Sequence, residues 1–295
     1  MRAPTLCGPW QSRDVLHQGN SPINGPHQGA WVELENGENW FFHFQDKGVY
    51  GRIVHLQPLC WGADGWPQIG ERLNDTGKGQ PVSLHRLPAL PVAPCCLQTS
   101  DDFRHGQPGL QWQWQANPQR HWLTPHQQGL RLRCALTSGY ISLYRLPQLL
   151  LQKFPAERFD VQTAVEPMFF QDGDEAGIAI YGQRFAALCV TYRTANLQLA
   201  LCHGWIDDRG ETHQQSIGLE EVTGCKEIEL GFQVDYDGVV HFRYRLAQRE
   251  WRQVTPQFSA GAGKWIGARM GIYARSEREN VKGSAIFSPF IVRLQ

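Results

Sequence analysis

Short apolar runs, separated at close intervals by glycine and proline, constrain the fold of this chain more than any other feature. The 295 residues include 30 glycines and 18 prolines. Between them lie runs rich in aromatic and β-branched residues, at 40–44, 51–56, 130–136, 177–181, 186–192, 239–246, 270–274 and 290–294. Such runs, bounded by turn residues, are typical of strands. We therefore expect an all-β fold, in which residues 147–154 form at most one short turn.

Two of these regions carry a clear strand pattern. In residues 238–246, Val240, Phe242, Tyr244 and Leu246 alternate with more polar residues, which predicts a strand with one buried and one solvated face. In the N-terminal region, runs at 30–34 and 39–44 flank an Asn-Gly pair that suits a hairpin turn with positive φ. A third run at 51–56 completes three antiparallel strands.

Residues 87–99 (LPALPVAPCCLQT) form the clearest break in the pattern. Three prolines in this segment exclude a helix or a central strand, so we expect a linker. The chain then divides into a domain at 1–86, the linker at 87–99 and a domain at 100–295, whose size suits a two-sheet sandwich. The first domain is too short for a closed propeller, since a blade takes about 40–50 residues and closure needs about four or more blades.

Charge and composition exclude several classes of partner. The chain has 28 basic and 28 acidic residues, so no overall field attracts nucleic acid or a membrane surface. It contains neither an N-terminal apolar run typical of a signal peptide nor an apolar stretch long enough to span a membrane. The eight cysteines have irregular spacing without a CxxC motif, which favours buried free thiols. We expect a cytoplasmic protein.

The segment 25–70 resembles the last part of the catalytic domain of glycoside hydrolase family 43, the β-xylosidase and α-L-arabinofuranosidase family. The similarity runs through the ordered motifs GPHQG, HFQDKGVYGR and HLQPLCWGADGWP. In the second domain, the segments at 101–103, 110–117, 149–156 and 263–271 resemble the concanavalin-A-like sandwich that follows the propeller in one branch of that family. The resemblance implies the C-terminal part of a longer enzyme, with 1–86 as the end of its five-bladed propeller.

Two site residues follow from this resemblance. His27 of GPHQG matches a histidine near the propeller axis, where it helps to organise a calcium ion or its water shell. Arg52 of YGR matches an arginine that hydrogen-bonds the sugar, a role that suits the rigid donor fork of a guanidinium. Taken without the resemblance, the same residues fit a turn histidine and an arginine that bridges strands. Some sandwiches of the type that this chain resembles hold a structural calcium between an early aspartate and one in the last strand. Asp101 or Asp102 is the candidate for the first ligand here, although the closing segment AIFSPF offers no partner aspartate.

The resemblance assigns no catalytic residue to this chain. Inverting hydrolysis needs a carboxylic acid and a carboxylate about 6.5–9.5 Å apart. The family places its base aspartate, its tuning aspartate and its acid glutamate in earlier blades, so we expect the chain alone to be inactive. The acidic cluster at 172–175 (DGDE) fits a solvated hairpin tip better than a catalytic pair.

Tryptophans could stack on sugar rings, but burial is the more general role of large aromatic residues in all-β domains. We therefore expect most to pack in the core, and Trp112 and Trp114 to share one strand face. Two functions remain open: part of an inverting glycosidase acting on xylosides or arabinofuranosides, or a non-catalytic sandwich that binds carbohydrate or another protein. The expected partners are xylo- or arabino-oligosaccharides and either the missing propeller blades or a second copy of the chain.

Overall fold

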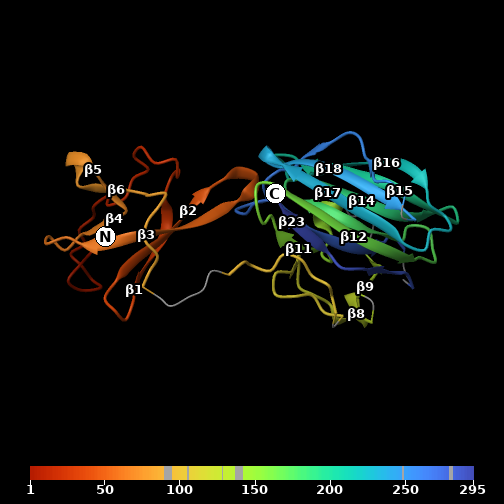
Figure 1. Cartoon of the computed structure of the whole chain (residues 1–295), viewed down its shortest axis with the longest axis horizontal. Coiled ribbons are helices and arrows are strands. Elements are labelled where there is room, and N and C mark those ends of the chain that lie inside the picture. Colours follow the sequence, from red (N-terminus) through yellow and green to blue (C-terminus); the bar gives the residue numbers. More distant parts are fainter. Residues whose placement is uncertain (90–94, 105, 128, 137–141, 248, 279–281) are drawn as a thin grey trace. The chain divides into compact units, whose positions relative to one another are not determined.

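A computed structural model describes residues 1–89, 95–104, 106–127, 129–136, 142–247, 249–278 and 282–295. The chain divides into two compact units (Figure 1). Unit 1 comprises residues 1–47 and 52–95, and unit 2 comprises residues 48–51 and 96–295. The described residues form strands and short 3₁₀ helices, with no α-helix, so the all-β prediction is confirmed.

Unit 1 is built on an antiparallel sheet whose four strands follow chain order. The strands are β1 (His27–Glu33), β2 (Asn39–Asp46), β3 (Arg52–Trp61) and β4 (Pro67–Ile69). A two-stranded sheet, β5 (Glu71–Leu73) and β6 (Lys78–Gln80), follows. The β1–β2 turn places Gly37 at φ 83°, as the Asn-Gly pair predicted, because glycine adopts this left-handed conformation without steric cost.

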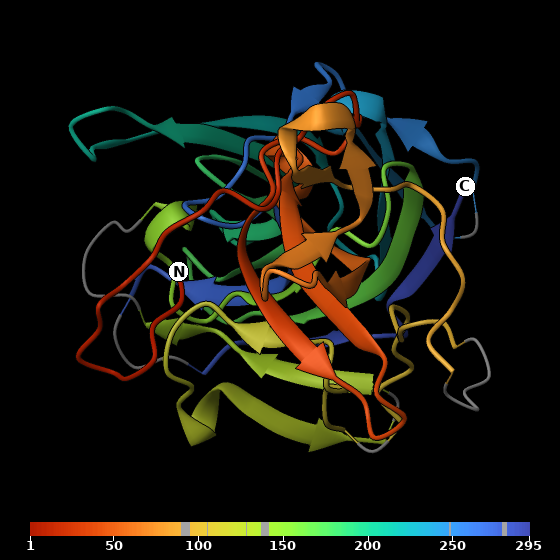
Figure 2. The ribbon, with the colours of Figure 1, turned by 90° about the vertical axis from the view of Figure 1, so that its left-hand side faces the viewer.

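Unit 2 is a sandwich of two large sheets (Figures 1 and 2). One sheet has the order β16-β15-β14-β13-β21-β11-β7, with β10 on β21, and the other has the order β19-β18-β17-β12-β22-β9-β8, with β20 on β18 and β23 on β12. Their bounds are β7 (Gln113–Trp114), β8 (Leu123–His126), β9 (Gly129–Arg133), β10 (Ala135–Leu136), β11 (Leu150–Lys153), β12 (Phe159–Met168), β13 (Glu175–Tyr181), β14 (Arg184–Arg193), β15 (Asn196–Ile206), β16 (Thr212–Glu221), β17 (Ile228–Asp235), β18 (Val239–Leu246), β19 (Arg252–Gln253), β20 (Phe258–Ser259), β21 (Arg269–Ser276), β22 (Ser284–Phe287) and β23 (Ile291–Leu294).

The strand pattern at 238–246 is confirmed, because Val240, Phe242, Tyr244 and Leu246 are all buried and alternate with less buried neighbours along β18. The expected turn at 147–154 is wrong, because Leu150–Lys153 is strand β11. Its continuous apolar run reflects burial on both faces: Leu150 belongs to the core between the sheets, and Leu151 belongs to a second core on the outer face of the β16–β7 sheet.

The acidic cluster at 172–175 is not a solvated tip, which corrects the prediction. Asp174 is fully buried and Glu175 is 7% exposed, because Glu175 begins β13 and lies directly opposite Arg275 of β21. The Arg275 Nε lies 3.0 Å from the Glu175 Oε1, and the Tyr273 hydroxyl donates to the same oxygen at 2.6 Å. Burial opposes ionisation of both groups, but their mutual attraction outweighs it, so the pKa of Glu175 is lowered and that of Arg275 is raised.

The cysteine prediction is correct in part. All eight thiols are free, and Cys134, Cys189 and Cys202 are buried, where desolvation raises their pKa. The expectation of burial is wrong for the four thiols that are exposed, Cys7, Cys60, Cys95 and Cys96.

Asp101 closes the sandwich near its last strands. It is 7% exposed and forms a β-bridge with Phe290. Its carboxylate accepts the amide of Phe103 at 2.9 Å, the amide of Gly109 at 2.8 Å and the indole Nε1–H of Trp112 at 2.9 Å. A carboxylate surrounded by N–H donors does not fit the role of a calcium ligand, and Asp102 is engaged by Arg104 at 2.6 Å.

We predict that Asp101→Ala lowers the free energy of unfolding by about 3 kcal/mol, because buried N–H groups lose their charged acceptor. Asp102→Ala, the neighbouring control, should change it by less than about 1 kcal/mol because its ion pair is exposed. Urea unfolding with and without a calcium chelator measures both. A stability loss on chelation in the wild-type chain that Asp101→Ala abolishes would show that Asp101 holds a metal instead.

Candidate functional site

The two residues singled out in unit 1 lie at the same end of its sheet. His27 begins β1 and is the β-ladder partner of Phe44, while Arg52 begins β3 opposite Asp46. The His27 and Phe44 ring centroids are 4.3 Å apart, and the Arg52 guanidinium carbon lies 4.5 Å from the centroid of Phe44. Phe44, which the sequence did not single out, therefore packs between the two predicted site residues.

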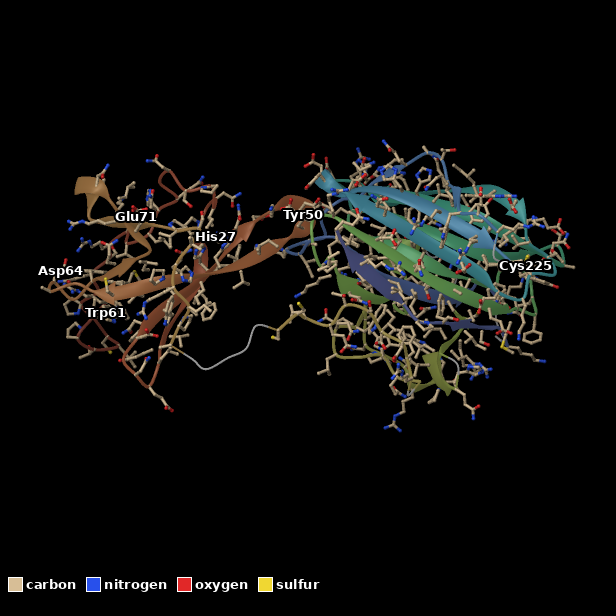
Figure 3. The ribbon with its side chains drawn as sticks, in the orientation of Figure 1. His27, Tyr50, Trp61, Asp64, Glu71 and Cys225 are labelled. Carbon is tan, nitrogen blue, oxygen red and sulfur yellow. The ribbon has the colours of Figure 1, made fainter. Side chains whose placement is uncertain are left out.

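The His27 ring has a defined hydrogen-bond arrangement. Its Nδ1 lies 2.5 Å from the Gly25 carbonyl oxygen, which can only accept, so Nδ1 carries the proton. In the neutral ring this leaves the lone pair on Nε2, the atom available to a water or a metal ion. The His27 side chain is exposed, at the position marked in Figure 3.

The described residues of unit 1 do not complete a metal site around His27. Among all described residues, the cluster of three potential metal ligands is Asp207, Glu211 and His213 in unit 2. His27 is not part of this cluster. Calcium prefers six to eight oxygen ligands, and a single imidazole does not supply them. The unit 1 residues therefore do not fit a calcium site by themselves, and the role of His27 stays a prediction.

A cavity of about 320 Å³ opens beside His27. Its lining includes Trp31, Phe41 and Trp61. The Trp31 and Trp61 rings meet edge to face with centroids 5.1 Å apart, and both indole N–H groups donate to the Asn39 Oδ1, at 2.6 and 3.3 Å. The two tryptophan residues are about half exposed, at 51% and 46%. The pair is thus held rigidly while presenting apolar surface to solvent.

Tryptophan burial differs along the chain. Trp40, Trp112 and Trp122 are buried, and Trp112 and Trp114 both pack with the core between the sheets, which confirms their shared role. Five others are exposed, which contradicts the expectation of burial for them: Trp10, Trp31, Trp61, Trp205 and Trp265. Periodicity could not separate these two groups, because each includes tryptophans on strands: Trp40 of β2 is buried, whereas Trp31 of β1 and Trp205 of β15 are exposed.

Two carboxylates of unit 1, Glu38 and Asp64, are poorly suited to acid catalysis because their pKa values are lowered. A hydrogen bond from the Ala89 amide lowers the pKa of Glu38, which also pairs with Arg86. A hydrogen bond from Arg13 lowers the pKa of Asp64. A general acid in a glycosidase needs the opposite shift, because it must be protonated near neutral pH. Of the described residues that line the cavity beside His27, one is a carboxylate, Asp14.

In unit 2, Glu227 and Glu229 line one small cavity of about 190 Å³. Both guanidinium nitrogens Nε and Nη2 of Arg245 engage Glu229, and Glu227 is exposed to solvent. Burial raises the pKa of Asp160, but this carboxylate forms ion pairs with Arg243 at 2.6 Å and with Arg293 at 3.6 Å. These groups are therefore engaged in structural ion pairs or open to water.

Residues 100–293 match the family profile of the beta-xylosidase C-terminal concanavalin A-like domain. The chain belongs to glycoside hydrolase family 43. A candidate beta-xylosidase from Xylanibacter ruminicola is 30% identical to it over 92% of this chain and 49% of its own length. A beta-xylosidase from Formosa agariphila is 24% identical over 94% of this chain and 49% of its own length. The chain thus spans about half the length of the curated family 43 relatives that it matches.

Solved family 43 structures share the fold. A xylan beta-1,4-xylosidase from Bacillus halodurans superposes with a TM-score of 0.78 at 20% identity, covering 98% of this chain and 58% of the other. A family 43 enzyme engineered for endo-xylanase and exo-arabinofuranosidase activity gives a TM-score of 0.80 at 21% identity, covering 98% and 58%. The fold is therefore that of a propeller segment followed by a concanavalin-A-like sandwich. In the described part of the chain, no helix is long and apolar enough to cross a membrane.

Proposed function

We propose that this chain supplies the closing propeller segment and the sandwich of an inverting glycosidase that acts on xylosides or arabinofuranosides. The acid, the base and the tuning carboxylate would come from polypeptide that corresponds to the earlier blades, so the chain alone would not hydrolyse glycosides. The observation that carries the proposal is the match to about half the length of the family 43 relatives, combined with a four-stranded sheet in unit 1 that exposes apolar side chains on both faces.

Both faces of that sheet expose apolar side chains, which supports the proposal. Trp31 and Trp61 are exposed on one face. On the other face Val32, Phe42 and Val54 are 37%, 40% and 67% exposed. The β-ladder register places each set on one side: Trp31 pairs with Phe41 and Phe41 with Gln57, which shares the strand face of Trp61, while Ala30 pairs with Phe42 and Phe44 pairs with Val54 on the other face. Trp40 on one face and Leu59 on the other are buried, so each face is covered only in part. Sheets normally cover at least one apolar face by packing, so two partly covered faces suit a blade that lies between neighbours.

In this proposal Arg52 binds the sugar. Its guanidinium lies above Phe44, and its Nη1 donates to the Gln28 Oε1 at 3.4 Å, which sets the direction of the donor fork. A fork of fixed direction can donate to adjacent hydroxyl oxygens of a sugar, and no proton transfer is required of it. His27 would orient a water or an ion through Nε2 once oxygen ligands are supplied from outside the chain.

The alternative, a non-catalytic sandwich that binds carbohydrate, is favoured by one specific feature. Unit 2 contains an open cleft beside the exposed Trp205, described in the next subsection. Carbohydrate binding by the sandwich is compatible with the first proposal, because a sandwich within a complete enzyme can also bind a glycan.

Limited proteolysis of the isolated chain tests the open sheet. We expect early cleavage within residues 1–95 and resistance within residues 100–295, because cleavage follows local opening of poorly packed structure. Equal resistance of the two regions would contradict an uncovered blade.

Val54→Lys tests whether the sheet face that carries Val54 is uncovered in the isolated chain. Since Val54 is 67% exposed, the substitution should change the free energy of unfolding by less than about 0.5 kcal/mol. It should also reduce binding of a hydrophobic fluorescent dye. A loss of more than about 2 kcal/mol would show that the chain itself covers this face.

A further inference from the structure

A cavity of about 630 Å³ lies at the end of the β15–β16 hairpin of the sandwich. The hairpin extends past the ends of the neighbouring strands (Figure 2, teal). We call this cavity the hairpin cleft. Its lining includes Arg145, Trp205, Thr212, His213, Gln214 and Gln215. A cavity of this size falls within the range of about 300–1,000 Å³ that is usual for small-ligand sites.

An aromatic platform forms one part of the hairpin cleft. Trp205 and His213 are directly opposite in the β15–β16 ladder, and their rings are nearly parallel, at 19°, with centroids 5.0 Å apart. Trp205 is 42% exposed. An indole that is held by a ring partner and still open to solvent offers apolar area at little cost in side-chain entropy.

The hairpin turn positions this platform. The His213 Nε2 lies 2.9 Å from the Asp207 Oδ2, while the Asp207 Oδ1 accepts the amides of Arg209 and Glu211 at 3.0 and 2.9 Å. The His213 hydrogen bond and the Glu211 amide lower the pKa of Asp207, so this carboxylate is charged. Its oxygens are therefore committed to orienting His213 and the turn, which favours a positioning role over a metal site.

Polar groups able to bind hydroxyls lie beside the platform. Arg145 is exposed, and its Nη2 donates to the Gly210 carbonyl at 3.1 Å, which fixes the guanidinium at the rim. The Gln214 Oε1 accepts the Leu143 amide at 2.7 Å, which orients the amide group of this side chain. Gln215 is exposed and Thr212 is half-buried. The cleft thus combines one aromatic face with planar and hydroxyl hydrogen-bonding groups.

This combination fits a neutral glycan better than other ligands. A sugar ring presents C–H groups on its face and hydroxyls at its edge, which match the indole and the amide and guanidinium groups respectively. An anionic ligand would meet one guanidinium among the described lining residues, that of Arg145, which donates to a hairpin turn that also carries the charged Asp207. An apolar ligand would leave Arg145 and the glutamines without water.

We propose that the hairpin cleft binds a short stretch of a neutral oligosaccharide, with Trp205 as the stacking platform and Arg145 and Gln215 as hydroxyl ligands. The expectation that this sugar is a xylo-oligosaccharide rests on the proposed function. Binding here requires no catalytic carboxylate, so it is a property of this chain alone.

Calorimetric titration of the full chain with xylohexaose, and separately with cellohexaose, tests this site. We expect the wild-type chain to bind xylohexaose. Trp205→Ala should weaken this binding at least tenfold and Trp205→Phe should weaken it less. Arg145→Ala should also weaken it. Phe170→Ala is the matched control, because Phe170 is 64% exposed and does not line the hairpin cleft. Circular dichroism establishes that each variant is folded.

Absence of binding to both glycans at millimolar concentration would overturn the proposal, as would equal binding by wild type and Trp205→Ala. Binding of cellohexaose alone, lost in Trp205→Ala, would support a glycan site and overturn its assignment to xylo-oligosaccharides. None of these results depends on turnover. The proposal of a glycan site can therefore be wrong while the glycosidase proposal is right, and the glycosidase proposal can be wrong while the glycan site is right.

Discussion

Fusing this chain to the part of the Xylanibacter ruminicola relative that it does not match is expected to produce turnover of 4-nitrophenyl β-xyloside or α-L-arabinofuranoside. The rate should exceed that of the isolated chain by at least about 10³, because the fusion adds the acid and base that inverting hydrolysis requires. Steady-state kinetics on purified monomeric fusion protein measures this gain. A folded fusion that binds substrate and remains inactive would contradict the proposed division of the site.

The fusion also makes the role of Arg52 measurable. Arg52→Ala should lower kcat/KM by about 10–100-fold, since a charge-assisted hydrogen bond contributes roughly 1.5–3 kcal/mol. Arg52→Lys should recover only part of this loss, because lysine keeps the charge without the fork. Arg72→Ala in β5 is the exposed control. Equal kinetics for wild type and Arg52→Ala would assign Arg52 a structural role.

The second large effect is expected in the sandwich, where Arg275→Met should lower the free energy of unfolding by about 3–5 kcal/mol. The Arg275 side chain is 4% exposed and that of Glu175 is 9% exposed, so the substitution leaves the Glu175 carboxylate buried without its cationic partner. Replacing both partners, in Glu175→Leu with Arg275→Met, should restore most of the stability, because an apolar pair removes the charge that needs a partner. Chemical denaturation measures all three proteins.

The pH dependence of this effect has a definite sign. In the wild type the pKa of Glu175 is lowered, so its contribution to stability is present above the unfolded-state value near 4.5 and is lost as the pH falls through the lower folded-state pKa. In Arg275→Met, protonation relieves the buried charge. The destabilisation should therefore shrink as the pH falls from 7 toward 4. A deficit that is constant over this range would show that packing, not charge, causes it.

The residues that the sequence placed correctly are those whose environment is set by local pattern. The alternation at 238–246 predicted β18 because one face of that strand is buried and the other is wet. The run Leu150–Lys153 gave no such signal, because both of its faces are covered and the alternation disappears. Glu175 was misplaced for a different reason: its partner Arg275 lies 100 positions away in the chain, and only the β13–β21 ladder brings them together.

Of the candidate sites, the one in unit 1 was predicted from the sequence and the hairpin cleft in unit 2 was not. Resemblance pointed to His27 and Arg52, and the sheet brings both beside Phe44. Reasoning from the sequence missed the hairpin cleft, because the pairing of Trp205 with His213 and the turn at Asp207 that orients His213 appear only in the folded hairpin. A tryptophan near a hairpin that is rich in Asp, Gly and His is a weak signal, but it was present in the sequence.

The central claim is that the groups able to transfer protons to and from a glycoside lie outside this chain. The most direct measurement is the hydrolysis of 4-nitrophenyl β-xyloside and α-L-arabinofuranoside by the isolated chain, purified to homogeneity and assayed at high concentration between pH 4 and pH 8. Our account predicts a rate equal to that of buffer throughout. Turnover that co-purifies with the chain and scales with its concentration would contradict it.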